Sequence, residues 1–328
     1  RTSREDQNSN QRSACRVYAE IAMQTTQIKQ NILKKSELSA ERKKILISAI
    51  MPLALIIFSG TLAFVAFKGG GNFLTASLSK LNKKKSFVDN FGRQYAFEET
   101  GRRSESASRN WWVNSGGRMV VSGGTAKTIV GDLSEGDRWR KEYTATNPED
   151  TDNGLHPQNI FRLVGQKNFK NFSQEVYFRI KKMNLSDSEN RNESNGFLLF
   201  NRYQDGNNLY YTGLRVDGYA VIKKKVNGKY YTMAEKKIFA DDYDRESHPN
   251  LIPIGRWLGV RAVVQSRKNG DVEIDLYWKN RKNTKKWKLV AQAVDNGKEG
   301  ARIRNAGYGG IRTDFMDVEF DNYKISEF

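Results

Sequence analysis

The chain is poor in cysteine, histidine and proline, with one, two and five of these residues in 328. The lone cysteine, Cys15, cannot form an intramolecular disulfide, so the fold does not depend on covalent cross-links. No cluster of Cys and His is available to bind zinc. No glycine-rich phosphate loop is present either, since Gly116-Gly117 and Gly123-Gly124 are typical of hairpin turns.

Acidic residues are also scarce relative to basic ones, and the formal net charge is +18. Residues 1–86 carry 15 Lys and Arg against 5 Asp and Glu, so the first quarter of the chain holds over half of the excess. A basic chain attracts anionic partners. We expect no nucleic acid partner, because zinc-finger spacing, an RNP-like motif and a basic groove-filling helix are all missing. Anionic lipid and acidic polysaccharide remain as candidate anionic partners.

One long apolar run stands out, at residues 45–67. It has 23 residues and no charge, and a helix needs about 20 apolar residues to cross a bilayer core. The sequence therefore predicts a transmembrane helix. The preceding positions 34–44 contain five Lys and Arg, whereas 68–78 contain only Lys68, which places the N-terminus in the cytoplasm.

This helix predicts a four-part organisation. Residues 1–44 form a basic, partly helical cytoplasmic segment, 45–67 a single membrane span, 68–86 a flexible tether and 87–328 an extracellular or periplasmic domain. The alternative is a cleaved signal peptide that ends at Ala63. Both interpretations place the large domain outside the cytoplasm.

From residue 87 onward, short apolar runs alternate with Gly, Asn and Asp turns, and no helix is expected. Tyr210 and Leu214 fall on one face of a strand, and Tyr211 and Arg215 on the other. About 240 residues of this pattern predict an all-β fold of two packed antiparallel sheets. The expected strands are Ser173–Lys181, Asn208–Val216, Tyr219–Val226, Lys229–Lys237, Trp257–Gln265, Val272–Trp278, Trp287–Ala293, Gly309–Asp314 and Met316–Ile325.

Several segments carry a resemblance to a known family. They include the turn and tyrosine strand of residues 200–211, Arg215-Val-Asp-Gly218, Gly309-Gly-Ile-Arg312 and the closing strand at 317–325. Together they resemble the concanavalin A-like lectin/glucanase jelly roll in its laminin-G-like variants, over residues 87–328. The resemblance implies a jelly-roll sandwich. It leaves the activity open, since this fold hosts lectins, hydrolases, lyases and adhesion modules.

The glucanases of this family carry a Glu-x-Asp-x-x-Glu motif, which supplies two carboxyls roughly 5 Å apart as nucleophile and acid/base. Glu273-Ile-Asp275 begins like that motif, but the position of the last Glu is Trp278. The acid/base is therefore missing, and the strand is interpreted as a solvated face.

Lyases of this fold use Tyr or His as acid and base and Arg with Gln or Asn to neutralise a uronate, which makes His156 and Tyr211 catalytic candidates by resemblance. The same residue types suit a binder of acidic glycan, because aromatic rings stack on sugars and Arg pairs with carboxylate. We predict a lectin-like binding domain for acidic polysaccharide, with a lyase or a non-glycan adhesion module as alternatives and an enzyme less favoured. The predicted ligand-binding residues are Tyr177, Arg179, Arg202, Tyr211, Arg215, Lys223 and Gln265.

Calcium is the one cofactor that the sequence suggests. Asp205, Asn207 and Asn208 form an oxygen-rich turn, and Asp321 lies where related jelly rolls bind calcium by resemblance. Carboxylate and amide oxygens are ligands that Ca²⁺ prefers. Such turns also form for backbone reasons alone, so both interpretations stay open.

Overall fold

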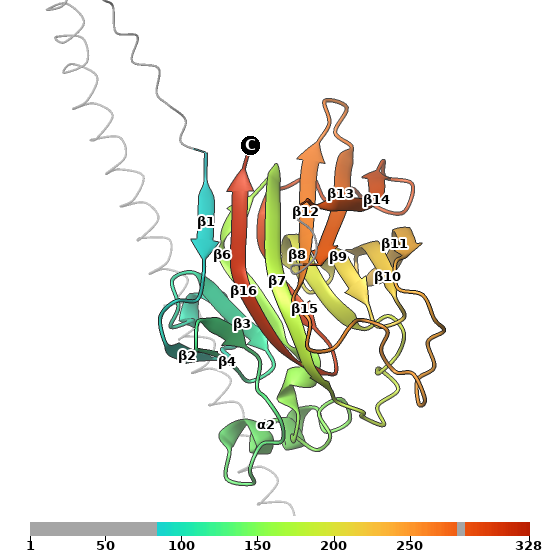
Figure 1. Cartoon of the computed structure of the whole chain (residues 1–328). Helices are drawn as coiled ribbons and strands as arrows, with labels where there is room; N and C mark the ends of the chain where they lie inside the picture. The colour runs from blue at the N-terminus through green and yellow to red at the C-terminus, as the bar shows by residue number, and fades with distance from the viewer. Residues whose placement is uncertain (1–83, 281–285) are drawn as a thin grey trace, which may run out of the picture. The chain divides into compact units, whose positions relative to one another are not determined.

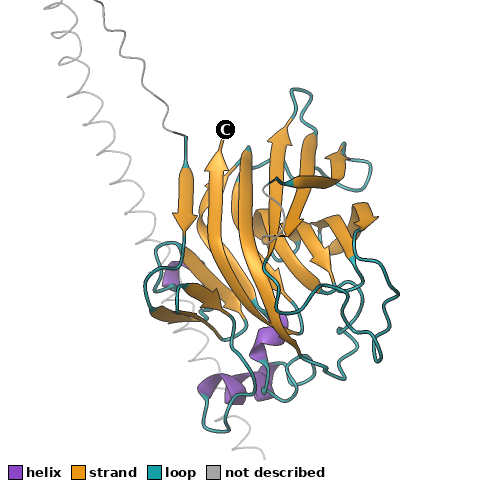
Figure 2. Cartoon of the chain, viewed as in Figure 1, coloured by secondary structure: helices purple, strands orange, loops and turns teal. Residues whose placement is uncertain are grey.

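The computed structural model describes residues 84–280 and 286–328, where sixteen strands form two antiparallel sheets (Figures 1 and 2). Sheet A has the order β14-β13-β12-β7-β16-β5-β4-β2, with β1 also paired to β16. Its strands are β1 (Ser86–Asp89), β2 (Tyr95–Glu98), β4 (Arg118–Ser122), β5 (Thr125–Lys127), β7 (Phe172–Met183), β12 (Leu258–Ser266), β13 (Val272–Asn280), β14 (Lys288–Asp295) and β16 (Met316–Glu327).

Sheet B has the order β11-β10-β9-β8-β15-β6-β3. Its strands are β3 (Trp111–Ser115), β6 (Arg162–Phe169), β8 (Gly196–Asp205), β9 (Asn208–Arg215), β10 (Tyr219–Val226), β11 (Lys229–Lys237) and β15 (Gly307–Thr313). The predicted all-β sandwich of two antiparallel sheets is confirmed, and β10 and β11 have the predicted bounds.

The main core lies between the two sheets. Phe178 on β7 stacks on Phe197 on β8, with ring centroids 3.9 Å apart and an interplanar angle of 5°. Alternate residues of both sheets join this cluster, among them Tyr210 and Leu214 of β9. Burial of such side chains contributes roughly 1.5–3 kcal/mol each. The remaining residues of each strand face outward, and they position the site described below.

Three predicted segments lie largely or wholly outside the described residues. These are the cytoplasmic segment at 1–44, the membrane helix at 45–67 and residues 68–83 of the tether. In the ranges 84–280 and 286–328, the structure contains no helix with the length and apolarity that crossing a bilayer requires.

The expectation that the large domain has no helix is wrong. Helix α2 spans Arg138–Thr146, and short 3₁₀ turns occur at Arg103–Glu105 and Pro157–Ile160. The side chain of Asp137 caps α2 by accepting a hydrogen bond from the Trp139 backbone N–H at 2.8 Å. Only Trp139 and Tyr143 of α2 are buried. Two buried residues in a helix of nine are too few to produce a recognisable helical period.

The glycine pair at 116–117 also differs from its expected role as a hairpin turn. It joins β3 in sheet B to β4 in sheet A, so the chain passes from one sheet to the other there. Both glycines have positive φ, 97° and 77°, and a Cβ atom on Gly116 would lie 2.7 Å from Phe161 Cα. Gly123-Gly124 does connect paired strands, β4 and β5.

Candidate functional site

The outward face of sheet B carries a pocket of about 460 Å³. We call it the sheet B pocket. Six of the seven strands of sheet B contribute to it, and the segment that precedes β8 lines it as well. Its lining residues are Asp150, Ile160, Arg162, Asn190, Asn192, Ser194, Asn195, Leu198, Tyr211, Lys223, Tyr230, Arg312, Asp314 and Phe315.

Strand alternation produces an apolar floor on this outward face. Leu198 and Tyr211 belong to a cluster that is separate from the main core, whereas their neighbours Phe197 and Tyr210 point inward. The Tyr211 ring lies 5.6 Å from Phe200 and 6.0 Å from Tyr230, stacked on the latter at 30°. Tyr211 and Phe200 are buried, whereas Tyr230 is exposed, so the Tyr230 ring offers a flat, apolar surface of the kind on which sugar rings stack.

Three cationic side chains line the same pocket. Arg312 donates from Nε to Asp314 Oδ1 at 2.8 Å, and its Cζ lies 5.3 Å from the centre of the Tyr211 ring. Arg162 donates from Nη1 to the Ile160 carbonyl at 3.1 Å. Lys223 Nζ is 3.3 Å from Ser194 Oγ.

Asparagine and serine side chains from the segment between β7 and β8 form a wall of the pocket. Asn195 Oδ1 accepts a hydrogen bond from the Asn192 backbone N–H at 2.7 Å. Asp150 Oδ1 accepts from Ser188 Oγ at 2.7 Å and from Asn190 Nδ2 at 2.9 Å. Burial raises the pKa of the Asp150 carboxyl, but the hydrogen bonds from Ser188, Asn190 and Asn147, together with Arg162, outweigh burial and lower that pKa overall. Amide and hydroxyl groups of this kind match the hydroxyls of a sugar.

Crowding of like charges shapes the electrostatics of the pocket. Burial lowers the pKa of the Lys223 ammonium, and the nearby Arg215 and Arg312 lower it further. Burial raises the pKa of the Tyr211 phenol above its ordinary value. At Tyr230 burial acts in the same direction, but Arg312, a hydrogen bond with Tyr211 and Lys225 outweigh it, so the Tyr230 pKa is lowered. The lining carries three cations, Arg162, Lys223 and Arg312, against the two carboxylates Asp150 and Asp314, so a net charge of +1 favours an anionic group here.

The seven predicted ligand-binding residues do not share one surface. Tyr211 and Lys223 line the sheet B pocket. Arg215 belongs to the same sheet but pairs with Asp217 and Glu235. The other four lie elsewhere: Tyr177, Arg179 and Gln265 are on β7 and β12 of sheet A, and Arg202 is buried.

The division has a physical cause, because strand alternation predicts whether a side chain points inward or outward but not which sheet it belongs to. On sheet A, Arg179 Nε donates to Glu319 Oε2 at 2.9 Å, and its Cζ lies 4.9 Å from the Trp257 ring centre. Arg202 occupies a position with φ of 48° where the β8–β9 pairing is irregular. Its guanidinium therefore turns inward and donates to the Lys170 and Ile303 carbonyls, both at 2.9 Å.

The two catalytic candidates are not brought together. Tyr211 lines the sheet B pocket, while His156 precedes the 3₁₀ turn at Pro157–Ile160 and is not a lining residue. His156 Nδ1 lies 2.6 Å from Asp152 Oδ2, and Nε2 lies 2.9 Å from Asp132 Oδ1. Burial opposes protonation, but the two carboxylates outweigh it and raise the pKa of His156. This geometry is that of a structural ion-pair cluster.

The carboxylates considered for glucanase chemistry lie on sheet A, away from the pocket strands. Glu273 pairs with Arg267, whose Nη2 is 3.0 Å away. Asp275 accepts from Gln292 Nε2 at 3.0 Å. Each therefore has a polar partner on the surface of the β12–β14 region, in line with a solvated strand face.

The residues proposed as calcium ligands do not form one cluster. Asp205 Oδ1 accepts from the Asn207 backbone N–H at 2.7 Å and from Asn208 Nδ2 at 3.0 Å, so its carboxylate caps the β8–β9 turn. Asp321 lies on β16 in the other sheet and accepts from the Asn322 backbone N–H at 2.6 Å. Within residues 84–280 and 286–328, no group of three His, Cys, Asp or Glu side chains is arranged to hold a metal ion.

Several residues of the sheet B pocket are not among the ligand-binding residues predicted from the sequence. Tyr230 pairs in register with Lys225 across the Asn227-Gly228 turn, which joins the expected strands Tyr219–Val226 and Lys229–Lys237. Arg312 alternates with the buried Ile311 on β15. The Asn- and Ser-rich run at 188–195 gave no strand signal, so nothing in the sequence placed it beside the pocket.

Comparisons with known proteins give structural likeness alone. No family model and no curated protein sequence matches the chain. The carbohydrate-binding module CBM66 from Bacillus subtilis is 16% identical, with a TM-score of 0.35 over 50% of this chain and 81% of that one. The Bacillus licheniformis β-glucanase is 11% identical, with a TM-score of 0.39 over 74% of this chain and 98% of that one. The exoplasmic/lumenal domain of VIP36 in its Ca²⁺/Man-bound form is 7% identical, with a TM-score of 0.37 over 73% of this chain and 91% of that one.

At these identities and TM-scores, the description of the fold rests on the strands of this chain itself. The all-β sandwich is established by its own pairing. The finer assignment to the concanavalin A-like family stays a prediction.

Proposed function

We propose that the domain binds carbohydrate in the sheet B pocket, with an acidic sugar as the preferred ligand. The observation that carries this proposal is the stacked pair Tyr211 and Tyr230 beside the side chains of Lys223 and Arg312 in a single pocket. The Tyr230 ring is 51% exposed and is backed by the buried Tyr211, so it supplies a platform for a pyranose. The cations supply charge-assisted hydrogen bonds to the carboxylate of the sugar.

The polar wall supports the same ligand class. Asn190, Asn192 and Ser194 present amide and hydroxyl groups to the pocket, and such groups match the equatorial and axial hydroxyls of a sugar. The pocket volume of about 460 Å³ lies within the range of about 300–1,000 Å³ found for small-molecule sites. We also propose that residues 45–67 anchor the chain in the membrane as a single span, so that a tether displays the domain outside the cell.

Binding assays on the full chain test the site. Alginate, pectate and glucuronan oligosaccharides would be titrated against the wild type, Lys223→Met and Lys288→Met. Lys288 is an exposed lysine at the start of β14 in the other sheet and serves as the matched control. Removal of one charge-assisted hydrogen bond costs about 1.5–3 kcal/mol, so we expect roughly 10- to 100-fold weaker binding for Lys223→Met. Binding of all three oligosaccharides by Lys223→Met with unchanged affinity would reject the pocket.

A second candidate is a polysaccharide lyase, and the two tyrosines favour it. The Tyr230 pKa is lowered and the Tyr211 pKa is raised, and opposite shifts in neighbouring groups suit a base and an acid. In a β-elimination the Tyr230 phenolate would take the proton at C5 of a uronate. The C5–H electrons would form the C4–C5 double bond as the C4–O bond breaks, and Tyr211 would protonate the departing oxygen.

An assay of turnover distinguishes a lyase from a binding domain. A lyase accumulates unsaturated uronate, which absorbs ultraviolet light, and Tyr230→Phe would abolish that product while still binding the oligosaccharide. Binding without product supports a lectin-like domain. A chain that binds none of the acidic or neutral glycans is left with the third predicted role, a protein-adhesion module.

A further inference from the structure

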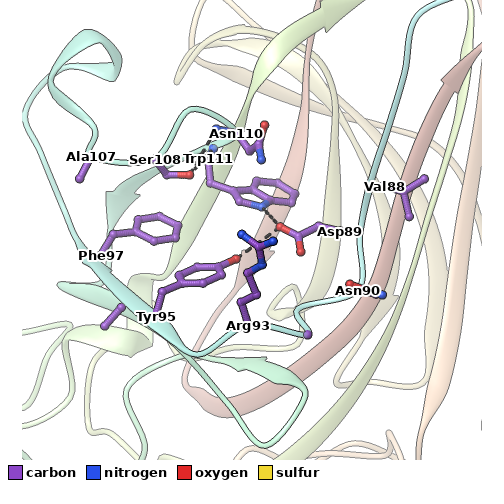
Figure 3. A pocket seen from close by; sticks show the side chains of 12 residues that line it. Val88, Asp89, Asn90, Arg93, Tyr95, Phe97, Ala107, Ser108, Asn110 and Trp111 are labelled. Carbon is purple, nitrogen blue, oxygen red and sulfur yellow. Dashed lines mark hydrogen bonds between the residues drawn. The ribbon is translucent and has the colours of Figure 1, made fainter.

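A second pocket of about 460 Å³ lies at the start of the domain and shares no lining residue with the sheet B pocket. We call it the β1 pocket. Figure 3 shows side chains from β1, the following turn, β2 and the segment before β3 converging on it. Its polar lining residues include Asp89, Asn90, Arg93, Tyr95, Ser108 and Asn110.

Three hydrogen bonds hold the Asp89 side chain in place in the β1 pocket. Its Oδ1 accepts a hydrogen bond from the Phe91 backbone N–H at 2.9 Å. Its Oδ2 accepts from Trp111 Nε1 at 2.8 Å and from the Tyr95 hydroxyl at 3.3 Å (Figure 3). All three donors are neutral groups, so they orient the carboxylate without neutralising its charge. A carboxylate held in this way still has lone pairs to accept hydrogen bonds from a ligand.

The aromatic residues around Asp89 have separate roles. Trp111 is 1% exposed and packs on Tyr323 with ring centroids 4.7 Å apart, so it orients Asp89 from the core. Tyr95 is only partly buried and stacks on Phe97 at 5.8 Å and 20°. The Tyr95 ring is therefore the one that offers a backed, flat surface to the pocket.

The charges of this pocket differ from those of the sheet B pocket. The β1 pocket has one carboxylate, Asp89, and one guanidinium, Arg93, which is exposed and extends toward Tyr95 and Trp111 in Figure 3. A uronate would bring its own carboxylate close to Asp89, and an amine would be repelled by Arg93. A neutral molecule with many hydroxyls avoids both costs, because its hydroxyls donate to Asp89 and accept from Arg93 and the amide of Asn110.

We propose that the β1 pocket is a second carbohydrate site, which takes a neutral sugar through hydrogen bonds to Asp89 and Arg93 and stacking on Tyr95. The proposal does not depend on what binds to the sheet B pocket. Two separate sites on one domain allow a single chain to engage two places on one polysaccharide, and linked sites raise the overall affinity without new contacts.

The test uses the full chain and neutral oligosaccharides derived from β-glucan, xylan and mannan, with choline as the cationic probe. Arg93→Ala removes an exposed side chain and leaves the core intact. Asp89→Asn keeps an acceptor for the Phe91 N–H but removes the charge. We expect at least tenfold weaker binding of a neutral oligosaccharide to both variants, and unchanged binding to Lys223→Met, which alters the other pocket.

The Trp111 indole N–H provides a readout of the site, since it is bonded to Asp89. In ¹H–¹⁵N spectra, assigned with Trp111→Phe, this signal should shift on addition of a neutral oligosaccharide to the wild type, and Arg93→Ala should need at least tenfold more oligosaccharide for the same shift. Three results would overturn the proposal: no neutral oligosaccharide binds, the binding is lost in Lys223→Met and retained in Arg93→Ala, or only choline moves the Trp111 signal. Loss of acidic-glycan binding in Lys223→Met bears on the sheet B pocket alone, so failures of the two proposals are distinguishable.

Discussion

Lys224 on β10 and Asp295 at the end of β14 form an ion pair inside the sandwich, with Nζ 3.0 Å from Oδ1. The side chains are 0% and 3% exposed. Tyr210 donates to the other carboxylate oxygen at 2.5 Å, and Lys224 also donates to the Gly300 carbonyl at 2.9 Å. Since β10 belongs to sheet B and β14 to sheet A, the pair ties the two sheets together.

Asp295→Asn should destabilise the domain strongly, because it leaves the buried Lys224 ammonium without a counter-charge. Breaking a buried pair from one side costs about 3–5 kcal/mol. Urea denaturation followed by tryptophan fluorescence would measure the free energy of unfolding.

The matched control is the double variant Lys224→Met/Asp295→Asn, which removes both charges and keeps an acceptor for the Tyr210 hydroxyl. We expect it to recover most of the stability lost in Asp295→Asn. A double variant that is less stable than Asp295→Asn would contradict this account of the pair.

His156 should make the stability of the domain depend on pH. Two carboxylates raise its folded-state pKa against the opposing effect of burial. The stabilisation is therefore fully present below the unfolded-state value of about 6.5, and it is lost as the pH rises through the folded-state pKa. Thermal unfolding of the wild type and His156→Gln, compared below and above that window, should show a difference that shrinks at high pH. A constant difference would mean that His156 contributes through packing alone.

The sequence predicted nine of the sixteen strands, because the signals of a single strand are local. Alternation and the turns Asp217-Gly218 and Asn227-Gly228 placed β10 and β11 at their observed bounds. Alternation also separated Tyr210 from Tyr211 correctly. Helix α2 was not predicted, because its signals in the sequence are one capping side chain and two buried residues.

The candidate site was predicted only in part, because it depends on pairings between distant strands. Tyr211 and Lys223 belong to adjacent strands β9 and β10, which a hairpin signal relates. Tyr177 has the same outward parity, but β7 pairs with β12 and β16 in sheet A. Arg312 reaches the pocket because β15 inserts between β8 and β6, a long-range order that local patterns do not encode.

Tyr230 and Tyr211 should titrate at different pH values. Although burial opposes ionisation of Tyr230, Arg312, the Tyr211 hydrogen bond and Lys225 lower its pKa below the ordinary value of about 10. Burial keeps Tyr211 protonated to higher pH. Ultraviolet difference titration should therefore show one phenol that ionises early, and Tyr230→Phe should remove that phase. Tyr231→Phe changes the neighbouring tyrosine of β11 and should leave it in place.

Salt should separate the two proposed pockets. The ligand of the sheet B pocket is held partly by Lys223 and Arg312, and charge interactions weaken as the Debye length falls from about 10 Å at 0.1 M salt to about 3 Å at 1 M. We therefore expect acidic oligosaccharides to bind several-fold more weakly at the higher concentration. A neutral oligosaccharide in the β1 pocket has no net charge to screen, so its affinity should change less than about twofold over the same range. A salt dependence as weak for the acidic oligosaccharides as for the neutral one would contradict the role of Lys223 and Arg312 in holding the acidic ligand.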